Sequence, residues 1–207
     1  FTALCQLEDS TEILCHVRNT GRCAELFRPG CRVWVQHTPS PSRKTAWTLI
    51  TVDKDGVLVN VDSLAPNKLF AEAVERGVLV PKSLSRIEQL RPEVKLGSSR
   101  LDWQLTGPEG RLWCEVKGVT LEVDGTALFP DAPTLRGLGH VETLRRLRAE
   151  GDFALAAFIV QMEGVNCFRP NTATQPDFAR ALREARDAGV EILCCGCRVT
   201  PDSVEPA

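Results

Sequence analysis

Two segments of alternating apolar and polar residues, 100–106 and 111–117, flank the loop 107–110, whose sequence is Gly-Pro-Glu-Gly. Alternation predicts strands with one buried face, and a short loop with glycine and proline between two strands predicts a β-hairpin. The apolar face of such a hairpin must be covered by the rest of the chain. Its polar face is then free to carry chemistry.

The predicted buried face holds Leu101, Trp103 and Leu105, so Asp102 points to the other side. If the hairpin closes symmetrically about its loop, Asp102 opposes Glu115 with about 5 Å between their Cβ atoms. Like charges this close repel unless a proton or a cation lies between them. Carboxylate oxygens suit hard ions, so the pair predicts a site for Mg²⁺ or Mn²⁺.

Lys117 follows two residues after Glu115 and shares its face of the strand. A divalent cation can polarise a phosphate and lower the pKa of a bound water, while a lysine orients the nucleophile or balances charge in the transition state. Asp102, Glu115 and Lys117 are therefore predicted as catalytic residues for metal-assisted phosphodiester hydrolysis. The alternative is a solvated hairpin face, because Glu-x-Lys is common on exposed strands.

The chain has 207 residues, 43% of them hydrophobic, which is enough for one large or two small domains. A formal net charge of −2 gives no global attraction to nucleic acid, so any DNA contact must come from a local basic surface. The longest apolar run, 153–160, is too short to span a bilayer, so no membrane segment is expected. Because the chain begins at Phe1, we expect its natural start to lie upstream.

The nine cysteines are odd in number and lie mostly in apolar runs, with no signal peptide before them. This usage predicts reduced, buried thiols in a cytoplasmic protein. Cys194, Cys195 and Cys197 are clustered, but a structural zinc site needs two pairs of Cys or His ligands, and a second pair at a suitable spacing is missing here.

Residues 1–62 read as five short strands with no room for a long helix, which predicts a five-stranded barrel of the oligonucleotide-binding (OB) type. The expected strands are 1–7, 12–17, 32–37, 47–52 and 57–61. Arg22, Arg43 and Lys44 lie in its connections and could contact phosphates. Trp34 and Trp47 could stack on bases, although tryptophan in an alternating strand is more often a core residue.

Residues 63–207 form the second predicted domain, an α/β sandwich with the carboxylate hairpin in its sheet. We expect a helix over 68–76 capped by Asn67, one over 134–149 and one over 177–188, with the apolar run as a central strand. Arg136 and His140 lie near the start of the second helix, where an anion is favoured. A solvated basic turn is the alternative reading. Arg100, beside Asp102, is a further candidate phosphate contact.

Several strings are specific enough to indicate a family. They are Asn19-Thr20-Gly21, Arg43-Lys44-Thr45, Pro66-Asn67, Ser99-Arg100-Leu101-Asp102, Glu115-Val116-Lys117, the stretch 129–137 and Phe168-Arg169-Pro170. Over nearly its whole length the chain resembles the sugar fermentation stimulation protein A family of prokaryotes.

The resemblance implies an N-terminal OB barrel joined to a domain of the PD-(D/E)XK nuclease superfamily, with Asp102, Glu115 and Lys117 as its motif residues. The Val116 carbonyl would be a further ligand of Mg²⁺ or Mn²⁺. Members of that superfamily often add an acid from the preceding helix. Glu72 is the first candidate for this acid and Glu93 the second.

The main hypothesis is a metal-dependent endonuclease acting on duplex or single-stranded DNA. Its predicted DNA-contacting residues are Arg22, Arg43, Lys44, Arg100, Arg136 and His140. The alternative is a non-catalytic DNA-binding regulator of sugar metabolism on a nuclease scaffold. An enzyme of sugar metabolism is disfavoured, because the sequence has neither a glycine-rich phosphate loop nor a nucleophile elbow. The oligomeric state stays open, with a homodimer as one option.

Overall fold

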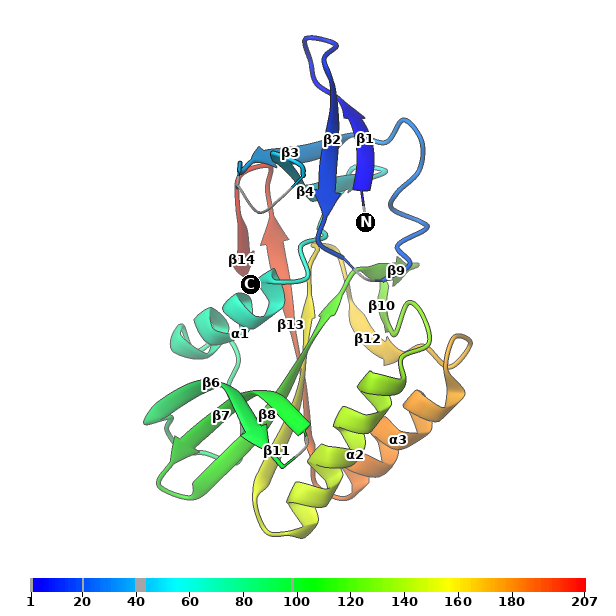
Figure 1. The fold of residues 1–207 in the computed structure, drawn as a ribbon. Coiled ribbons are helices and arrows are strands. Elements are labelled where there is room, and N and C mark those ends of the chain that lie inside the picture. Colours follow the sequence, from blue (N-terminus) through cyan, green and yellow to red (C-terminus); the bar gives the residue numbers. More distant parts are fainter. Residues whose placement is uncertain (1, 20, 40–43, 98) are drawn as a thin grey trace.

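The computed structural model describes residues 2–19, 21–39, 44–97 and 99–207. Figure 1 shows a smaller unit of strands built from the N-terminal part of the chain, next to a larger unit in which helices flank a long sheet. The mixed α/β architecture predicted from the sequence is confirmed.

The smaller unit is a five-stranded sheet with the order β1-β2-β4-β3, in which β5 also pairs with β4. β2 and β4 are parallel, whereas β1 and β2 are antiparallel. All five expected strands are present, with ends shifted by at most two residues. They are β1 (Thr2–Gln6), β2 (Glu12–Val17), β3 (Val33–His37), β4 (Trp47–Lys54) and β5 (Val57–Asn60).

The larger unit contains a six-stranded sheet with the order β14-β13-β11-β8-β7-β6. β11 is parallel to both of its neighbours, while β6, β7 and β8 form an antiparallel meander. The strands are β6 (Gln89–Leu96), β7 (Ser99–Gly107), β8 (Gly110–Val119), β11 (Phe153–Val160), β13 (Glu191–Val199) and β14 (Val204–Pro206).

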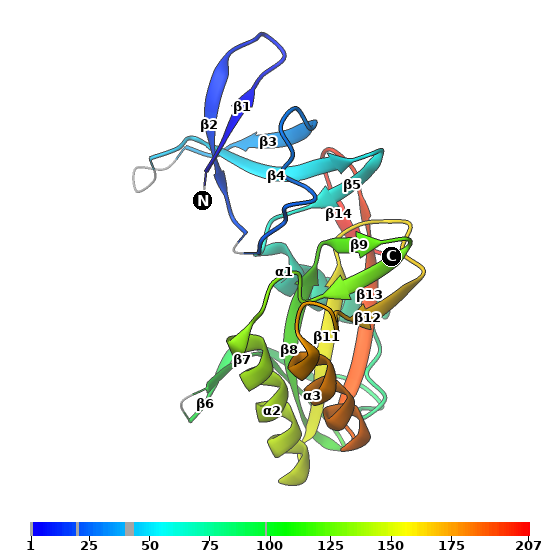
Figure 2. The same cartoon turned by 90° about the vertical axis from the view of Figure 1, so that its right-hand side faces the viewer.

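Helices cover both faces of this sheet. α1 (Ala65–Glu75) packs with Leu155, Ala157 and Ile159 of β11 in one apolar cluster. α2 (Leu135–Ala149) and α3 (Pro176–Asp187) pack with the alternate residues of β11 in the other, and Figure 2 shows these two helices side by side on one face. Burial on both faces explains why the apolar run of β11 does not alternate, as predicted for a central strand.

A third, small sheet has the order β12-β10-β9 and joins the two units. Its strands are β9 (Leu121–Val123), β10 (Thr126–Phe129) and β12 (Cys167–Pro170). The Asp131 carboxylate, just after β10, accepts hydrogen bonds from the backbone N–H groups of Arg22 (2.8 Å) and Cys23 (3.4 Å) in the barrel. This contact is one of several between the barrel and the larger unit, which also share an apolar cluster.

The start of α1 corrects one sequence expectation. The helix begins at Ala65 with Leu64 at the N-cap position, so Asn67 lies within the first turn and does not cap the helix. Pro66 makes the earlier start favourable, because proline is tolerated in the first turn, where its missing N–H would be unpaired. The cap of α2 is as predicted, since the Thr134 hydroxyl accepts the Gly137 N–H at 2.9 Å. In the part of the chain that the structure describes, every helix is too short or too polar to cross a membrane.

Candidate metal and phosphodiester site

The hairpin of β7 and β8 has the register expected from the sequence. Thr106 pairs with Arg111, and the turn is tighter than the four-residue loop because Gly107 and Gly110 also pair. The ladder continues to the pair Trp103 and Cys114. This register places Asp102 at the end of the ladder, beside the middle of β8.

At Asp102 strand β7 departs from regular alternation. Trp103 and Leu105 pack toward α1, whereas Leu101 belongs to the apolar cluster that contains α2. The expectation that all three share one face is therefore wrong. The Asp102 carboxylate takes part in the change, because its Oδ2 accepts the backbone N–H of Val116 at 2.8 Å. The Asp102 side chain therefore bonds to β8 at the point where the alternation of β7 changes. This bond holds the carboxylate next to the backbone of β8.

Glu115 lies on β8 with its side chain 5% exposed. Its Oε1 is contacted by Lys117 Nζ and by His140 Nδ1, and these two nitrogens are 3.3 Å apart. A carboxylate only accepts hydrogen bonds, so His140 must carry its proton on Nδ1. Burial raises the pKa of Glu115, but the hydrogen bond from His140 and the charge of Lys117 outweigh burial and hold that pKa below its usual range.

The pKa of Asp102 shifts the opposite way. Burial and the nearby charge of Glu115 raise it, and the hydrogen bond from Val116 only partly offsets them. The two acids thus interact electrostatically, as the hairpin register predicts. A further mark of the site is the second oxygen of Glu115: Oε2 is buried and has no hydrogen-bond partner among the described residues.

These observations fit a hard cation. Such an ion would use the unpaired Oε2 of Glu115 and would favour the ionised form of Asp102. The described residues contain no group of three or more His, Cys, Asp or Glu side chains arranged to hold a metal. Two carboxylates, backbone oxygen and water would therefore have to make up the ligand set.

Asn67 is the site residue that sequence reasoning missed. Its Nδ2 donates to Asp102 Oδ1 (3.3 Å), and its Oδ1 accepts the indole N–H of Trp103 (2.8 Å). Its place in the Pro66-Asn67 string was the available signal, but a capping role accounted for it at the sequence level. The contact exists only because α1 packs across the hairpin.

The two candidates for a helix-borne acid lie elsewhere. Glu72 forms an ion pair with Arg76 on the same helix (2.8 Å). Glu93 is 75% exposed and pairs with Arg100 across the β6–β7 ladder (3.4 Å). The group that α1 brings to Asp102 is the amide of Asn67.

The predicted DNA-contacting residues occupy different settings. Arg22, Lys44, Arg100 and Arg136 are exposed. His140 is not, because its side chain is only 13% exposed and is directed at Glu115. Arg43 lies outside the described residues.

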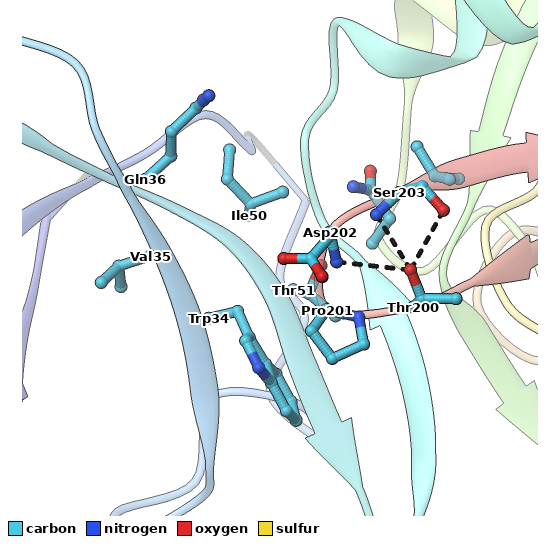
Figure 3. Close-up of a pocket in the computed structure, with 11 residues that line it drawn as sticks. Trp34, Val35, Gln36, Ile50, Thr51, Thr200, Pro201, Asp202 and Ser203 are labelled. Carbon is cyan, nitrogen blue, oxygen red and sulfur yellow. Dashed lines mark hydrogen bonds between the residues drawn. The ribbon is translucent and has the colours of Figure 1, made fainter. Parts of the chain in front are cut away.

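Among the cavities that adjoin the barrel, two are bordered by Trp34. One, of about 310 Å³, lies between the barrel and the β13–β14 turn, and Figure 3 shows Trp34 on its wall opposite Asp202. The other is a groove of about 1070 Å³ lined by residues 3–9 and 27–35. Trp34 borders both and carries the Arg32 guanidinium 5.1 Å from its ring centroid. Trp47, by contrast, packs against the core, as expected for a strand tryptophan.

Barrel, sheet and carboxylate–lysine hairpin together define a two-domain protein with an OB domain followed by a nuclease-like α/β domain. Comparison with known families agrees with this class. The family model "SfsA N-terminal OB domain" matches residues 1–61, and the model "Sugar fermentation stimulation protein RE domain" matches residues 64–203. The chain belongs to the sugar fermentation stimulation protein family.

Individual relatives give the same result. The sugar fermentation stimulation protein homologue of Desulfitobacterium hafniense strain Y51 is 43% identical over 197 residues, covering 95% of this chain and 84% of that protein. The homologue of Ruminiclostridium cellulolyticum is 42% identical over 205 residues, covering 99% of this chain and 88% of that protein. The solved structure of Pyrococcus furiosus SfsA in complex with Ca²⁺ matches with a TM-score of 0.87 and 28% identity, covering 100% of this chain and 87% of that one.

Proposed function

We propose that this protein is a Mg²⁺- or Mn²⁺-dependent DNA endonuclease whose centre is formed by Asp102, Glu115 and Lys117. The observation that carries the proposal is the buried Glu115: one of its oxygens holds Lys117, and the other is buried without a partner among the described residues. A solvated hairpin face, the alternative considered from the sequence, would not bury a carboxylate in this way.

Asp102, Glu115 and the Val116 carbonyl would hold the cation, which would supply charge for the scissile phosphate and a water of lowered pKa. The Ca²⁺ in the Pyrococcus furiosus structure supports a hard ion in this family, because Ca²⁺ and Mg²⁺ both prefer oxygen ligands. Lys117 would position the attacking water and offset negative charge on the phosphate. His140 holds the Glu115 oxygen that Lys117 also contacts.

DNA would be held by exposed basic residues around this centre and on the barrel. Arg136 lies on the first turn of α2, where the helix dipole adds to its attraction for a phosphate. Arg100, Arg22, Arg43 and Lys44 would supply further backbone contacts. Because all nine cysteines are free thiols, we place the protein in the reducing cytoplasm.

The test is cleavage of supercoiled plasmid and of single-stranded DNA in Mg²⁺, Mn²⁺ or EDTA. We expect metal-dependent cutting by the wild type and a loss of at least about 100-fold in Lys117→Ala and Asp102→Ala, the scale at which groups that stabilise the transition state act. Lys82→Ala is the matched control, because Lys82 is exposed and its recorded contact to Glu191 is through the backbone. If the Lys117→Ala variant cuts DNA at the wild-type rate, Lys117 has no part in the mechanism.

A non-catalytic DNA-binding regulator remains the second candidate. It is favoured by the occupation of Glu115 Oε1, since Lys117 and His140 both compete with a cation for that oxygen. The two candidates differ in whether their action on DNA depends on a metal ion, which a chelator tests. A regulator should bind duplex DNA in EDTA with unchanged affinity and leave plasmid intact in Mg²⁺ or Mn²⁺, whereas the nuclease should nick it.

A further inference from the structure

The amide of Asn67 has a single possible orientation. The Trp103 indole N–H can only donate, so the Asn67 oxygen must face it, at 2.8 Å. The Asn67 NH₂ group must then face Asp102, whose Oδ1 lies 3.3 Å away. The contact between Asn67 and Asp102 is therefore a hydrogen bond from a neutral donor to a carboxylate.

This bond completes the support of Asp102. Oδ2 is held by the Val116 N–H and Oδ1 by Asn67, so the carboxylate plane is set from both sides. Each carboxylate oxygen can accept about two hydrogen bonds or ligands, so each keeps capacity for a cation. Asp102 is thus oriented before any ion binds.

The position of Asn67 follows from how α1 sits on the sheet. Gly118 of β8 is where the helix approaches, because an added Cβ there would lie 2.7 Å from Pro66. Glu72 lies five residues after Asn67, about 140° further around the helix axis, and points to Arg76. The face of α1 that meets the site therefore carries an amide, which adds no negative charge.

We propose that Asn67 is a positioning residue for Asp102, and that its neutral amide, which adds no negative charge, limits how strongly the site binds a divalent cation. This inference rests on the proposed function in one respect, namely that Asp102 and Glu115 are the cation ligands. In this proposal α1 orients a cation ligand, Asp102, and contributes no ligand of its own.

The test is calorimetric titration of the full chain with Mn²⁺ alone, without DNA. Outer groups that orient metal ligands typically affect metal affinity by about 10–100-fold, so Asn67→Ala should bind Mn²⁺ that much more weakly. Asn166→Ala, which changes an exposed asparagine in the β11–β12 connection, is the matched control and should bind as the wild type does. Equal affinity in Asn67→Ala and wild type would overturn the positioning role.

The substitution Asn67→Asp adds a negative charge at this position and keeps the shape of the side chain. Without metal, its carboxylate should repel Asp102 and lower the melting temperature, while Mn²⁺ should raise that temperature by more than it does in wild type. A rise equal to or smaller than that of wild type would overturn the proposal that the neutral amide limits cation binding. A wild type that binds no Mn²⁺ would overturn both this inference and the proposed function. A wild type that binds Mn²⁺ but cuts no DNA would overturn only the proposed nuclease activity.

Discussion

At the scale of single residues, Glu115 is the most constrained side chain of the site. Two nitrogens share one of its oxygens, and the pKa of this acid is held below its usual range despite burial. Interactions with a charged carboxylate stabilise the folded state only while the acid is ionised. The pH dependence of stability should therefore report on Glu115.

The direction of this pH dependence follows from the sign of the pKa shift of Glu115. Because the folded-state pKa is depressed, the contribution of Glu115 is fully present above its ordinary value of 4.5 and is lost as the pH falls toward the lower folded value. In EDTA, wild type should melt at a higher temperature than Glu115→Gln near neutral pH, with a gap that narrows below about pH 4.5. Thermal melts at a series of pH values measure this. A gap that stays constant on acidification would contradict it.

At the scale of elements, the contact between α1 and β8 decides where the site can form. Gly118 follows Lys117 directly, and an added Cβ would collide with Gln161 as well as Pro66. A larger residue at this position would push the helix off the sheet, and Asn67 would move with it.

Gly118→Ala should therefore destabilise the fold by about 1–3 kcal/mol, the usual cost of overpacking. Gly196→Ala on β13 is the matched control, because a Cβ there meets nothing within 4 Å. Denaturant unfolding of both variants gives the comparison. Equal stability of the two would mean that α1 and β8 can separate at no cost.

At the scale of the whole molecule, the barrel and the larger unit share one apolar cluster and are also joined by a few polar contacts. Gln161, buried at the end of β11, donates to Asn60 and Asp62, and Asp131 accepts from the N–H groups of Arg22 and Cys23. Hydrogen bonds to a charged acceptor are worth about 1.5–3 kcal/mol each. The two bonds to Asp131 are therefore expected to contribute measurably to the free energy of unfolding.

Asp131→Ala should lower the free energy of unfolding by about 1–3 kcal/mol, since it leaves two backbone donors without their acceptor. Asp177→Ala, which removes an exposed acid at the start of α3, should change stability by less than about 1 kcal/mol. Chemical denaturation measures both. A loss in Asp131→Ala no larger than that in Asp177→Ala would show that the barrel is held by other contacts.

Local sequence determined the strands of the barrel, the hairpin with its register, the cap of α2 and the buried β11. In each case the signal lies within a few residues: a turn sequence, an alternation, a threonine before a helix or an unbroken apolar run. The hairpin register, from Thr106 with Arg111 to Trp103 with Cys114, could be inferred because it depends only on its own loop.

Tertiary structure alone decided the rest. β12 and β14 are short strands whose partners lie far away or past a turn, so their own residues carry little signal. The reversal of β7 at Asp102, the inward turn of His140 and the bond from Asn67 arise where α1 and α2 pack on opposite faces of one sheet. Sequence proximity specifies which residues share a strand, but only the packing of helices on that strand specifies which side chains meet across it.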